Sequence, residues 1–377
     1  MSEKTINSIA LRTPELSVNT IPEKIESLQM LRGVAVLMVL AYHMGTYEAK
    51  ACTDPLLGHF AKIGAAGVDI FFVISGFVMI MISNRAKNSE DRPGNFLLHR
   101  AVRIYPIYWF YTSIALTVFY FHPSLVRRDG GIGETSLLRS ILLFPDRGAP
   151  IIGQGWTLIH EMYFYVGFTL ILTGGRKYRK KLLLLWAGIL SLICYVLPTS
   201  WFGSSISSNV FLKLVFNPLT FEFLGGCMLA YVIARNWTRW AKTIFILGVC
   251  LLLISPTTMY WVGATSQELF FGIPALLIVY GAVAMERNFG FTGPRFLRVI
   301  GDASYSIYLS HIFCLSASVL VWKSFKWVGV MDNLVILAMM VVVSLAAGIF
   351  SYRFIERPSQ RFFRNLLNKK NRLRTTP

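Results

Sequence analysis

Two side chains in the first apolar stretch of the chain are of types that do chemistry in proteins. Arg32 and His43 lie eleven residues apart in LRGVAVLMVLAYHMGTY, residues 31–47. Eleven helical residues turn through about 1100°, or roughly 20° past three full turns, so both side chains are expected on one helix face about 16 Å apart. An ionisable imidazole within an apolar span indicates a functional site. Hydrogen-bonded packing between helices is the alternative.

Two carboxylates follow in later apolar stretches at depths close to that of His43. Asp69 is about six residues into GAAGVDIFFVISGFVMIMI, and Glu161 lies similarly deep in GQGWTLIHEMYFYV. Carboxylates inside a membrane face partners or cavities rather than lipid. We therefore expect His43, Asp69 and Glu161 to meet at one level, unless helix packing keeps them apart.

A second group of cations precedes the third apolar stretch, in FLLHRAVRIYPIYWF. Arg100 and Arg103 are three residues apart and share a helix face. Paired arginines bind phosphate through their forked guanidinium groups, whereas ordinary positive charge at the cytoplasmic surface is the alternative. Tyr105 is assigned to the same site, although it also fits an interfacial aromatic belt.

Four further residues are candidates for holding a substrate. Gln154 and Trp156 stand where the longest polar loop enters the fourth apolar stretch, and an amide beside an aromatic ring suits a sugar. An interfacial tryptophan is an equally good explanation of Trp156. Glu222 lies near the middle of an apolar stretch, and His311 closes the motif GDASYSIYLSH. Structural hydrogen bonding is the alternative for both residues.

The elements that must position these residues are apolar helices. The chain has 377 residues, of which 54% are hydrophobic and 15% charged. This composition excludes an ordinary soluble domain and predicts an all-α, polytopic membrane bundle. About ten spans are expected, at residues 31–48, 63–83, 104–122, 156–173, 181–198, 210–234, 243–260, 269–285, 303–322 and 333–352.

The distribution of positive charge predicts the orientation of these spans. Of the 37 lysines and arginines, 28 fall in the two termini and alternate loops, and 8 fall in the other loops. The positive-inside rule then places both termini in the cytoplasm. We expect a cytoplasmic tail at residues 1–29, a transmembrane domain at 30–355 and a basic tail at 356–377 that lies on anionic lipid.

Other features of the sequence exclude several classes of protein. The net charge of +18 is spread between apolar spans rather than over one soluble face, which argues against nucleic-acid binding. The five cysteines have no metal-ligand or disulfide spacing, so neither a metal site nor a disulfide framework is expected. The first 29 residues lack the short apolar core of a signal peptide, so no signal peptide is expected.

The motifs together resemble the acyltransferase-3 family of bacterial integral membrane O-acyltransferases. The chain is most similar to members that acetylate exopolysaccharide or lipopolysaccharide O-antigen, and the resemblance extends from about residue 26 to residue 360. The matching features are Arg32 and His43 with ten residues between them, GVDIFFVISGF at 67–77, Arg100 and Arg103 followed by IYPIYW, WTLIHEMYFY at 156–165, SYSIYLSH at 304–311 and FIERP at 354–358.

The resemblance implies a reaction and roles for the candidate residues. The co-substrate is acyl-CoA, usually acetyl-CoA, on the cytoplasmic side, with no permanently bound cofactor, and the acceptor is a glycan or lipid-linked polysaccharide on the outer side of the bacterial inner membrane. The arginines would bind the CoA phosphates. His43 would act as general base, oriented by Asp69 or Glu161. An acyl-histidine intermediate is the other route. We see no appended soluble domain, so transfer by the membrane domain alone is expected.

Two other classes of protein share some of these features. A proton-coupled transporter or flippase also has buried carboxylates and histidines, but typically has inverted repeats and broken helices in matching halves. We find no such pairing in this sequence. A non-catalytic subunit of a polysaccharide export assembly is the second alternative, and it would tolerate loss of His43. The sequence leaves the acceptor sugar, the acyl chain and the oligomeric state open.

Overall fold

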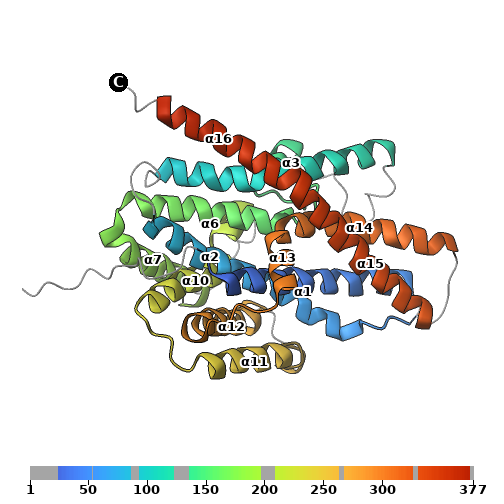
Figure 1. Ribbon diagram of the computed structural model, residues 1–377, viewed down its shortest axis with the longest axis horizontal. Helices are drawn as coiled ribbons and strands as arrows, with labels where there is room; N and C mark the ends of the chain where they lie inside the picture. The colour runs from blue at the N-terminus through green and yellow to red at the C-terminus, as the bar shows by residue number, and fades with distance from the viewer. Residues whose placement is uncertain are drawn as a thin grey trace, which may run out of the picture.

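The computed structural model describes residues 24–52, 54–85, 93–122, 136–196, 209–262, 267–325 and 330–373. Within these ranges every regular element is a helix, and no strand is present (Figure 1). The elements are α1 (Glu26–Ala51), η2 (Gly58–Ala66), α2 (Gly67–Arg85), α3 (Pro93–Phe121), α5 (Leu137–Ile141), α6 (Gly155–Thr173), α7 (Arg176–Ser191), η5 (Leu192–Val196), α9 (Val210–Val215), α10 (Thr220–Ala234), α11 (Ala241–Val262), α12 (Gln267–Phe289), α13 (Arg295–Asp302), α14 (Ser304–Phe325), α15 (Val330–Ser351), η6 (Tyr352–Glu356) and α16 (Arg357–Leu373).

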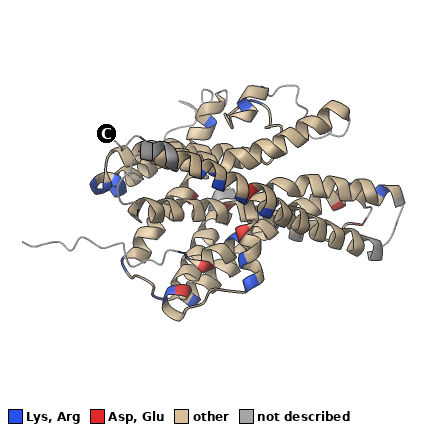
Figure 2. Ribbon diagram, turned by 45° about the horizontal axis from the view of Figure 1, so that its top comes forward, with Lys and Arg blue, Asp and Glu red and all other residues tan. Residues whose placement is uncertain are grey.

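The predicted all-α, multi-pass membrane fold is confirmed. Eight helices in the described part of the chain are long and apolar enough to cross a bilayer. The expected spans at 156–173 and 181–198 are not among them, because His160 and Glu161 interrupt the apolar run of α6 and five basic residues open α7. In Figure 2 most of the helical ribbon is tan, the colour of residues other than Lys, Arg, Asp and Glu. The count of ten and the orientation stay predictions.

Helix α1, which carries Arg32 and His43, is enclosed by other elements. It packs against η2, α2, α12, α13 and α14, which come from both halves of the chain (Figure 1). The neighbouring η2 and α2 approach α1 closely at two glycines. A Cβ on Gly64 would stand 2.1 Å from the carbonyl oxygen of Met38, and a Cβ on Gly67 2.3 Å from that of Ala35. Only glycine permits this backbone contact, which brings the first turn of α2 alongside α1.

Residues 136–154, which precede α6, lie along the middle of α3 rather than at its end at Phe121. The side chains of Tyr105, Tyr108 and Trp109 donate hydrogen bonds to the carbonyls of Leu142, Ser140 and Ile141 at 2.8, 2.8 and 3.0 Å. Trp109 precedes the last residue of α3 by twelve residues, or about 18 Å along the axis. Residues 136–154 therefore turn back along α3, and the three side chains satisfy carbonyls that a membrane interior would otherwise leave unpaired.

This re-entrant segment changes where α6 begins. The sequence places the start of α6 at the outer surface and the start of α14 at the cytoplasmic surface. Instead, Thr157 in the first turn of α6 shares a 2.8 Å hydrogen bond with Tyr308 in the second turn of α14. The two helices start at a common level, so depth counted from the sequence overstates the separation of their residues.

The basic tail forms a helix that continues from the last span. The π-helical turn η6 joins α15 to α16, and α16 packs against α3. In Figure 1 α16 leaves the bundle at an angle. Exposed Phe362 and Leu366 alternate with basic residues along it, which is the composition of a helix that lies on a lipid surface.

Candidate active site

A small cavity of about 250 Å³ surrounds Arg32. We call it the arginine cavity. Its polar lining includes Gln29 and Arg32 of α1, Arg103 of α3, and Glu161 and Tyr165 of α6. Ser304, Tyr305 and Tyr308 of α14 complete the wall. Four helices thus converge on one cationic, hydrogen-bonding pocket.

Hydrogen bonds fix the orientation of the Arg32 guanidinium. It donates to Oγ of Ser304 at 2.9 Å and to Oε1 of Gln29 at 3.4 Å. Tyr165 donates to the Glu161 carboxylate, one turn away on α6. Because the guanidinium is held from two sides, it presents a fixed fork to a ligand in the cavity.

The predicted pair Arg100 and Arg103 belongs to the same charged group. Both act electrostatically on Glu161 and Tyr165. Arg103 also interacts with Arg32 and with Glu356, whose carboxylate accepts a 2.5 Å hydrogen bond from Ser306. Arg100 lies over the ring of Phe96, 5.9 Å from its centroid. Arg32 of α1 and the pair Arg100 and Arg103 of α3, which is distant from Arg32 in sequence, therefore gather near one end of α1.

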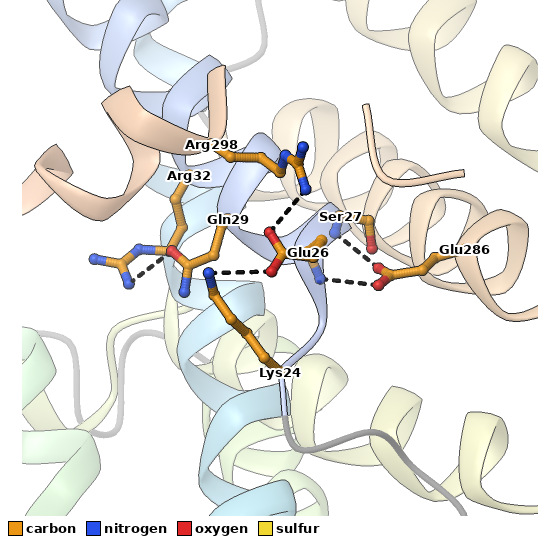
Figure 3. Close-up of polar contacts among 7 residues, drawn as sticks. All are labelled: Lys24, Glu26, Ser27, Gln29, Arg32, Glu286 and Arg298. Atoms are coloured by element: carbon orange, nitrogen blue, oxygen red, sulfur yellow. Dashed lines mark hydrogen bonds and ion pairs between the residues drawn. The ribbon is translucent and has the colours of Figure 1, made fainter. Parts of the chain in front are cut away.

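The end of α1 nearest to Arg32 is held by groups on α12 and α13 (Figure 3). The Glu286 carboxylate accepts hydrogen bonds from the backbone N–H groups of Glu26 and Ser27 at 2.9 and 2.7 Å. Glu26 in turn forms ion pairs with Lys24 and Arg298, each at 3.1 Å. A carboxylate at a helix N-terminus satisfies otherwise unpaired donors and complements the helix dipole. This network fixes α1 along its axis and hence the position of Arg32.

A larger cavity of about 1820 Å³ surrounds His43. We call it the histidine cavity. Asp69, Gln154 and Trp156 line it together with His43 and Tyr308. Asp69 is 5% exposed, and the Trp156 ring is 42% exposed. The cavity volume exceeds the roughly 300–1,000 Å³ of a typical small-molecule pocket.

His43 and His311 form a pair within this region. Nε2 of His311 lies 3.4 Å from Nδ1 of His43, and the ring centroids are 4.9 Å apart. Nδ1 of His43 is also 2.9 Å from the carbonyl oxygen of Val39, and Nδ1 of His311 is 2.6 Å from that of Tyr308. A carbonyl only accepts, so neutral His43 carries its proton on Nδ1 and leaves the Nε2 lone pair available. His311 then offers its own Nε2 as a second acceptor for the same N–H.

The two cavities adjoin near the middle of α1. Val68 and Tyr308 line both of them. The Tyr308 hydroxyl forms a 2.8 Å hydrogen bond with the Thr157 hydroxyl and donates a hydrogen bond to the Gln154 carbonyl at 3.3 Å. A thin chain that enters through the arginine cavity would therefore reach His43 by passing Tyr308.

The structure brings together most, but not all, of the residues selected from the sequence. His43 and Asp69 share the histidine cavity, whereas Glu161 lines the arginine cavity with Arg32 and Arg103. The shared level predicted for His43, Asp69 and Glu161 fails for Glu161, because α6 starts inside the bundle. Tyr105 holds the re-entrant segment through Leu142.

The structure gives the surroundings of two further candidates. Glu222 lies near the middle of the candidate span Val210–Ala234, as expected, and stands in the first turn of α10, because Asn217 and Pro218 separate α9 from α10. It is 2% exposed and packs against Gly272 of α12. His311, predicted to bind substrate, is 1% exposed and contacts His43 directly.

Sequence reasoning missed three residues of the site. Gln29 and Ser304 hold Arg32, and Tyr308 lies between the cavities. Gln29 is one helical turn before Arg32, which was an available signal. Ser304 and Tyr308 lie in the same motif as His311, but only the fold brings that motif to α1. Within the described residues no cluster of three or more acidic, histidine or cysteine side chains could hold a metal.

Comparisons with known proteins identify the family of the chain. The family model described as "Acyltransferase domain", that of the acyltransferase-3 family, matches residues 25–353. The exopolysaccharide production protein ExoZ of Rhizobium meliloti is 31% identical over 313 residues, which are 80% of this chain and 91% of ExoZ. The peptidoglycan O-acetyltransferase OatA of Listeria monocytogenes and the O-acetyltransferase OatA of Staphylococcus aureus are each 26% identical. They cover 92% and 89% of this chain, but the alignments span only 57% of either OatA. No solved structure matches the chain.

The chain belongs to the acyltransferase-3 family. It is a multi-pass membrane enzyme, an O-acyltransferase.

Proposed function

We propose that this enzyme transfers an acetyl group from acetyl-CoA to a hydroxyl of a surface or exported polysaccharide. The observation that carries the proposal is the pair of adjoining cavities along α1. One presents arginines suited to the phosphates of CoA, and the other is large and contains an imidazole with an available lone pair. The names of ExoZ and OatA, which refer to exopolysaccharide production and O-acetyl transfer, support a polysaccharide acceptor.

The donor would lie along α1 from Arg32 toward His43. Arg32, Arg100 and Arg103 would bind its phosphates, because guanidinium groups form paired, charge-assisted hydrogen bonds with phosphate oxygens. The extended pantetheine arm would then cover the distance of about 16 Å that eleven helical residues span. This would place the thioester beside the imidazole, at the junction lined by Tyr308.

His43 would act as general base through Nε2. It would take the proton of the acceptor hydroxyl while the hydroxyl oxygen attacks the thioester carbonyl carbon. Collapse of the tetrahedral intermediate breaks the C–S bond, and the imidazolium returns the proton to the departing thiolate. The products are an acetyl ester and free CoA. Proton transfer by a positioned side chain contributes roughly 10²- to 10⁴-fold to a rate. The acyl-histidine route would use the same Nε2 as nucleophile.

His311 would position His43 for this step. Its Nε2 and the Val39 carbonyl both accept from Nδ1–H of His43, which fixes the tautomer and would stabilise the imidazolium that forms. In serine hydrolases a carboxylate has this role. Asp69, in the same cavity, would contribute its charge there. Glu161 would instead balance the charge of the arginines that bind the donor.

The proposal is tested by acetyl transfer in isolated membranes. Labelled acetyl-CoA is supplied with base-treated, de-O-acetylated surface polysaccharide, and the wild type is compared with His43→Ala and His122→Ala at matched expression. His122 is exposed beyond the end of α3 and lines neither cavity. His122→Ala therefore controls for the loss of a histidine outside the proposed site. We expect label to be lost only in His43→Ala.

The other outcomes distinguish the competing functions. Equal label in all three proteins would remove His43 from the chemistry and favour a non-catalytic subunit of an export assembly. No label with any of them, while proton-coupled uptake of a glycan depends on His43, would favour a transporter. For location, we propose the bacterial inner membrane, and fractionation of membranes by density checks this.

A further inference from the structure

Three lysines line the histidine cavity, and each comes from a different element. Lys50 lies on α1, Lys62 on η2 and Lys323 on α14. All three side chains are exposed. Among the described residues that line this cavity there is one acidic side chain, Asp69, and it is buried beside α1. The accessible part of the cavity is therefore positively charged.

The three cavity lysines are unexpected on the side of the protein that is predicted to face outward. The loops predicted to lie outside contain few basic residues, as the positive-inside rule requires. In the described part of these loops the basic residues are Lys50, Lys62, Arg139, Arg147 and Lys323. Arg139 is paired with Asp146 at 3.1 Å. The rule depletes this side of cations, yet three of these five described basic residues line a single cavity.

The register of α1 relates this charge to the reacting group. Lys50 follows His43 by seven residues and Arg32 by eighteen, and eighteen helical residues make five full turns. Arg32, His43 and Lys50 therefore occupy one face of α1. Lys50 lies about 10 Å beyond His43 along the axis, which is comparable to the length of a disaccharide. An anionic group bound at Lys50 would thus be one or two sugar units away from the hydroxyl at His43.

Other residues of the same cavity suit a saccharide. The rings of Tyr42 and Trp156 are 37% and 42% exposed, and both line the cavity with the buried amide of Gln154. Exposed aromatic rings stack on the apolar faces of sugars, and an amide both donates to and accepts from hydroxyls. The lining therefore combines side chains that can contact sugar rings and hydroxyls with lysines that can bind an anionic group.

We infer that the acceptor is an anionic saccharide, bound through a carboxylate or phosphate group at Lys50, Lys62 and Lys323 while a neighbouring hydroxyl reaches His43. The inference rests on the proposed acetyl transfer and adds the chemical class of the acceptor. Lysines at a membrane surface also attract lipid phosphates. That role is separated from acceptor binding by the test, because a lipid contact does not distinguish charged from neutral acceptors.

The test compares acceptor dependence in variants and in modified acceptors. Membranes contain the wild type, Lys62→Gln/Lys323→Gln, Lys62→Arg/Lys323→Arg, or Arg147→Gln as a control cation outside the cavity. Each is assayed with labelled acetyl-CoA and three acceptors. These are the de-O-acetylated surface polysaccharide, the same polymer with carboxylates reduced to alcohols, and the same polymer after removal of phosphate by aqueous hydrofluoric acid.

We expect the glutamine variant to raise the KM for the native polymer at least tenfold and to leave the KM for acetyl-CoA unchanged. The arginine variant and Arg147→Gln should resemble the wild type. One of the two modified polymers should be a poor acceptor for the wild type, and this identifies carboxylate or phosphate as the anion.

Two results would overturn the inference. One is that the wild type uses both modified polymers as well as the native one. The other is that the glutamine variant loses activity equally with charged and neutral acceptors, which points to lipid contact. Failure of the proposed function is seen separately in the comparison with His43→Ala, as equal label in the wild type and this variant or as no label in either.

Discussion

At the scale of single residues, the partner of His43 is the main departure from expectation. The sequence offered two carboxylates, and the structure adds a second imidazole. Nε2 of His311 is 3.4 Å from Nδ1 of His43, and His311 is almost fully buried. A neutral acceptor in this position fixes the tautomer of His43 without placing another charge in an apolar region, where an unpaired charge is costly.

We predict that His311→Leu lowers kcat by roughly 10- to 100-fold, because a hydrogen bond to a charged group contributes about 1.5–3 kcal/mol and about 1.4 kcal/mol corresponds to tenfold. The KM for acetyl-CoA should not change, because Arg32 and Arg103 are untouched. His311→Gln should recover much of the rate, since its amide oxygen accepts the same N–H. Steady-state kinetics in membranes provide the measurement, and a leucine variant with wild-type kcat would contradict the prediction.

The sequence predicted residue types better than it predicted neighbours. The helical register of Arg32 and His43, and the lead-in helix with Arg100 and Arg103, follow from local periodicity, and the corresponding helices are present. The position of Glu161 depended on depth counted from the end of a span, and this failed because residues 136–154 turn back into the bundle. Contact between His43 and His311 links residues 268 positions apart, which no local pattern specifies.

At the scale of elements, α13 is the helix whose packing on α1 supports the proposed donor site. Arg298 on α13 pairs with Glu26, and Ser304 just beyond α13 accepts from Arg32. The approach is close enough that a Cβ on Gly301 would stand 1.8 Å from the carbonyl oxygen of Gln29. A side chain there must push α13 away from the end of α1.

Gly301→Ala is therefore expected to raise the KM for acetyl-CoA several-fold and to lower the thermal stability of the purified protein. Overpacking of this kind costs about 1–3 kcal/mol. Gly188→Ala on α7 is the matched control, because a Cβ there meets no atom within 4 Å and alanine is the better helix former. Equal melting temperatures and equal KM values for the two variants would show that α13 does not position Arg32.

Asp146 is the residue that closes the re-entrant segment before α6. Its carboxylate accepts hydrogen bonds from the backbone N–H of Ser136 at 2.7 Å and of Arg147 at 2.9 Å, and it pairs with Arg139. The hydrogen bond from Ser136 is the largest cause that lowers the pKa of Asp146 below its ordinary value. The stabilisation is thus present above the unfolded-state pKa of about 3.9 and is lost as pH falls through the lower folded-state value.

We predict that Asp146→Asn at neutral pH makes residues 136–154 more accessible to protease, because the charge that holds Ser136 and Arg139 is gone. The wild type should gain the same accessibility only when the pH falls below the ordinary range of an aspartate. Limited proteolysis with an acid-stable protease, followed by mass spectrometry of the fragments, measures both. An Asp146→Asn protein with the wild-type cleavage pattern at both pH values would contradict this role.

At the scale of the whole molecule, the proposed reaction requires two substrates to approach from opposite sides of a membrane. The arginine cavity and the histidine cavity lie toward opposite ends of α1 and meet at Tyr308. Because α6 and α14 both start near this junction, the proposed reacting centre lies beside the ends of these two helices, next to the middle of α1. Such an arrangement lets a polar site exist within an apolar bundle, since helix ends supply polar groups that the site itself satisfies.

The orientation of this arrangement gives the last prediction. Lys62 lines the histidine cavity, and Arg239 lies between α10 and α11, at the end of the molecule predicted to face the cytoplasm. Both side chains are exposed. In a cysteine-free background, a membrane-impermeant maleimide should label Lys62→Cys in intact spheroplasts and label Arg239→Cys only after permeabilisation. Labelling of both before permeabilisation would place both ends of the molecule outside, and the reverse order would place the acceptor cavity in the cytoplasm. A single enzyme could not then carry an acetyl group across the bilayer in the way that the two cavities suggest.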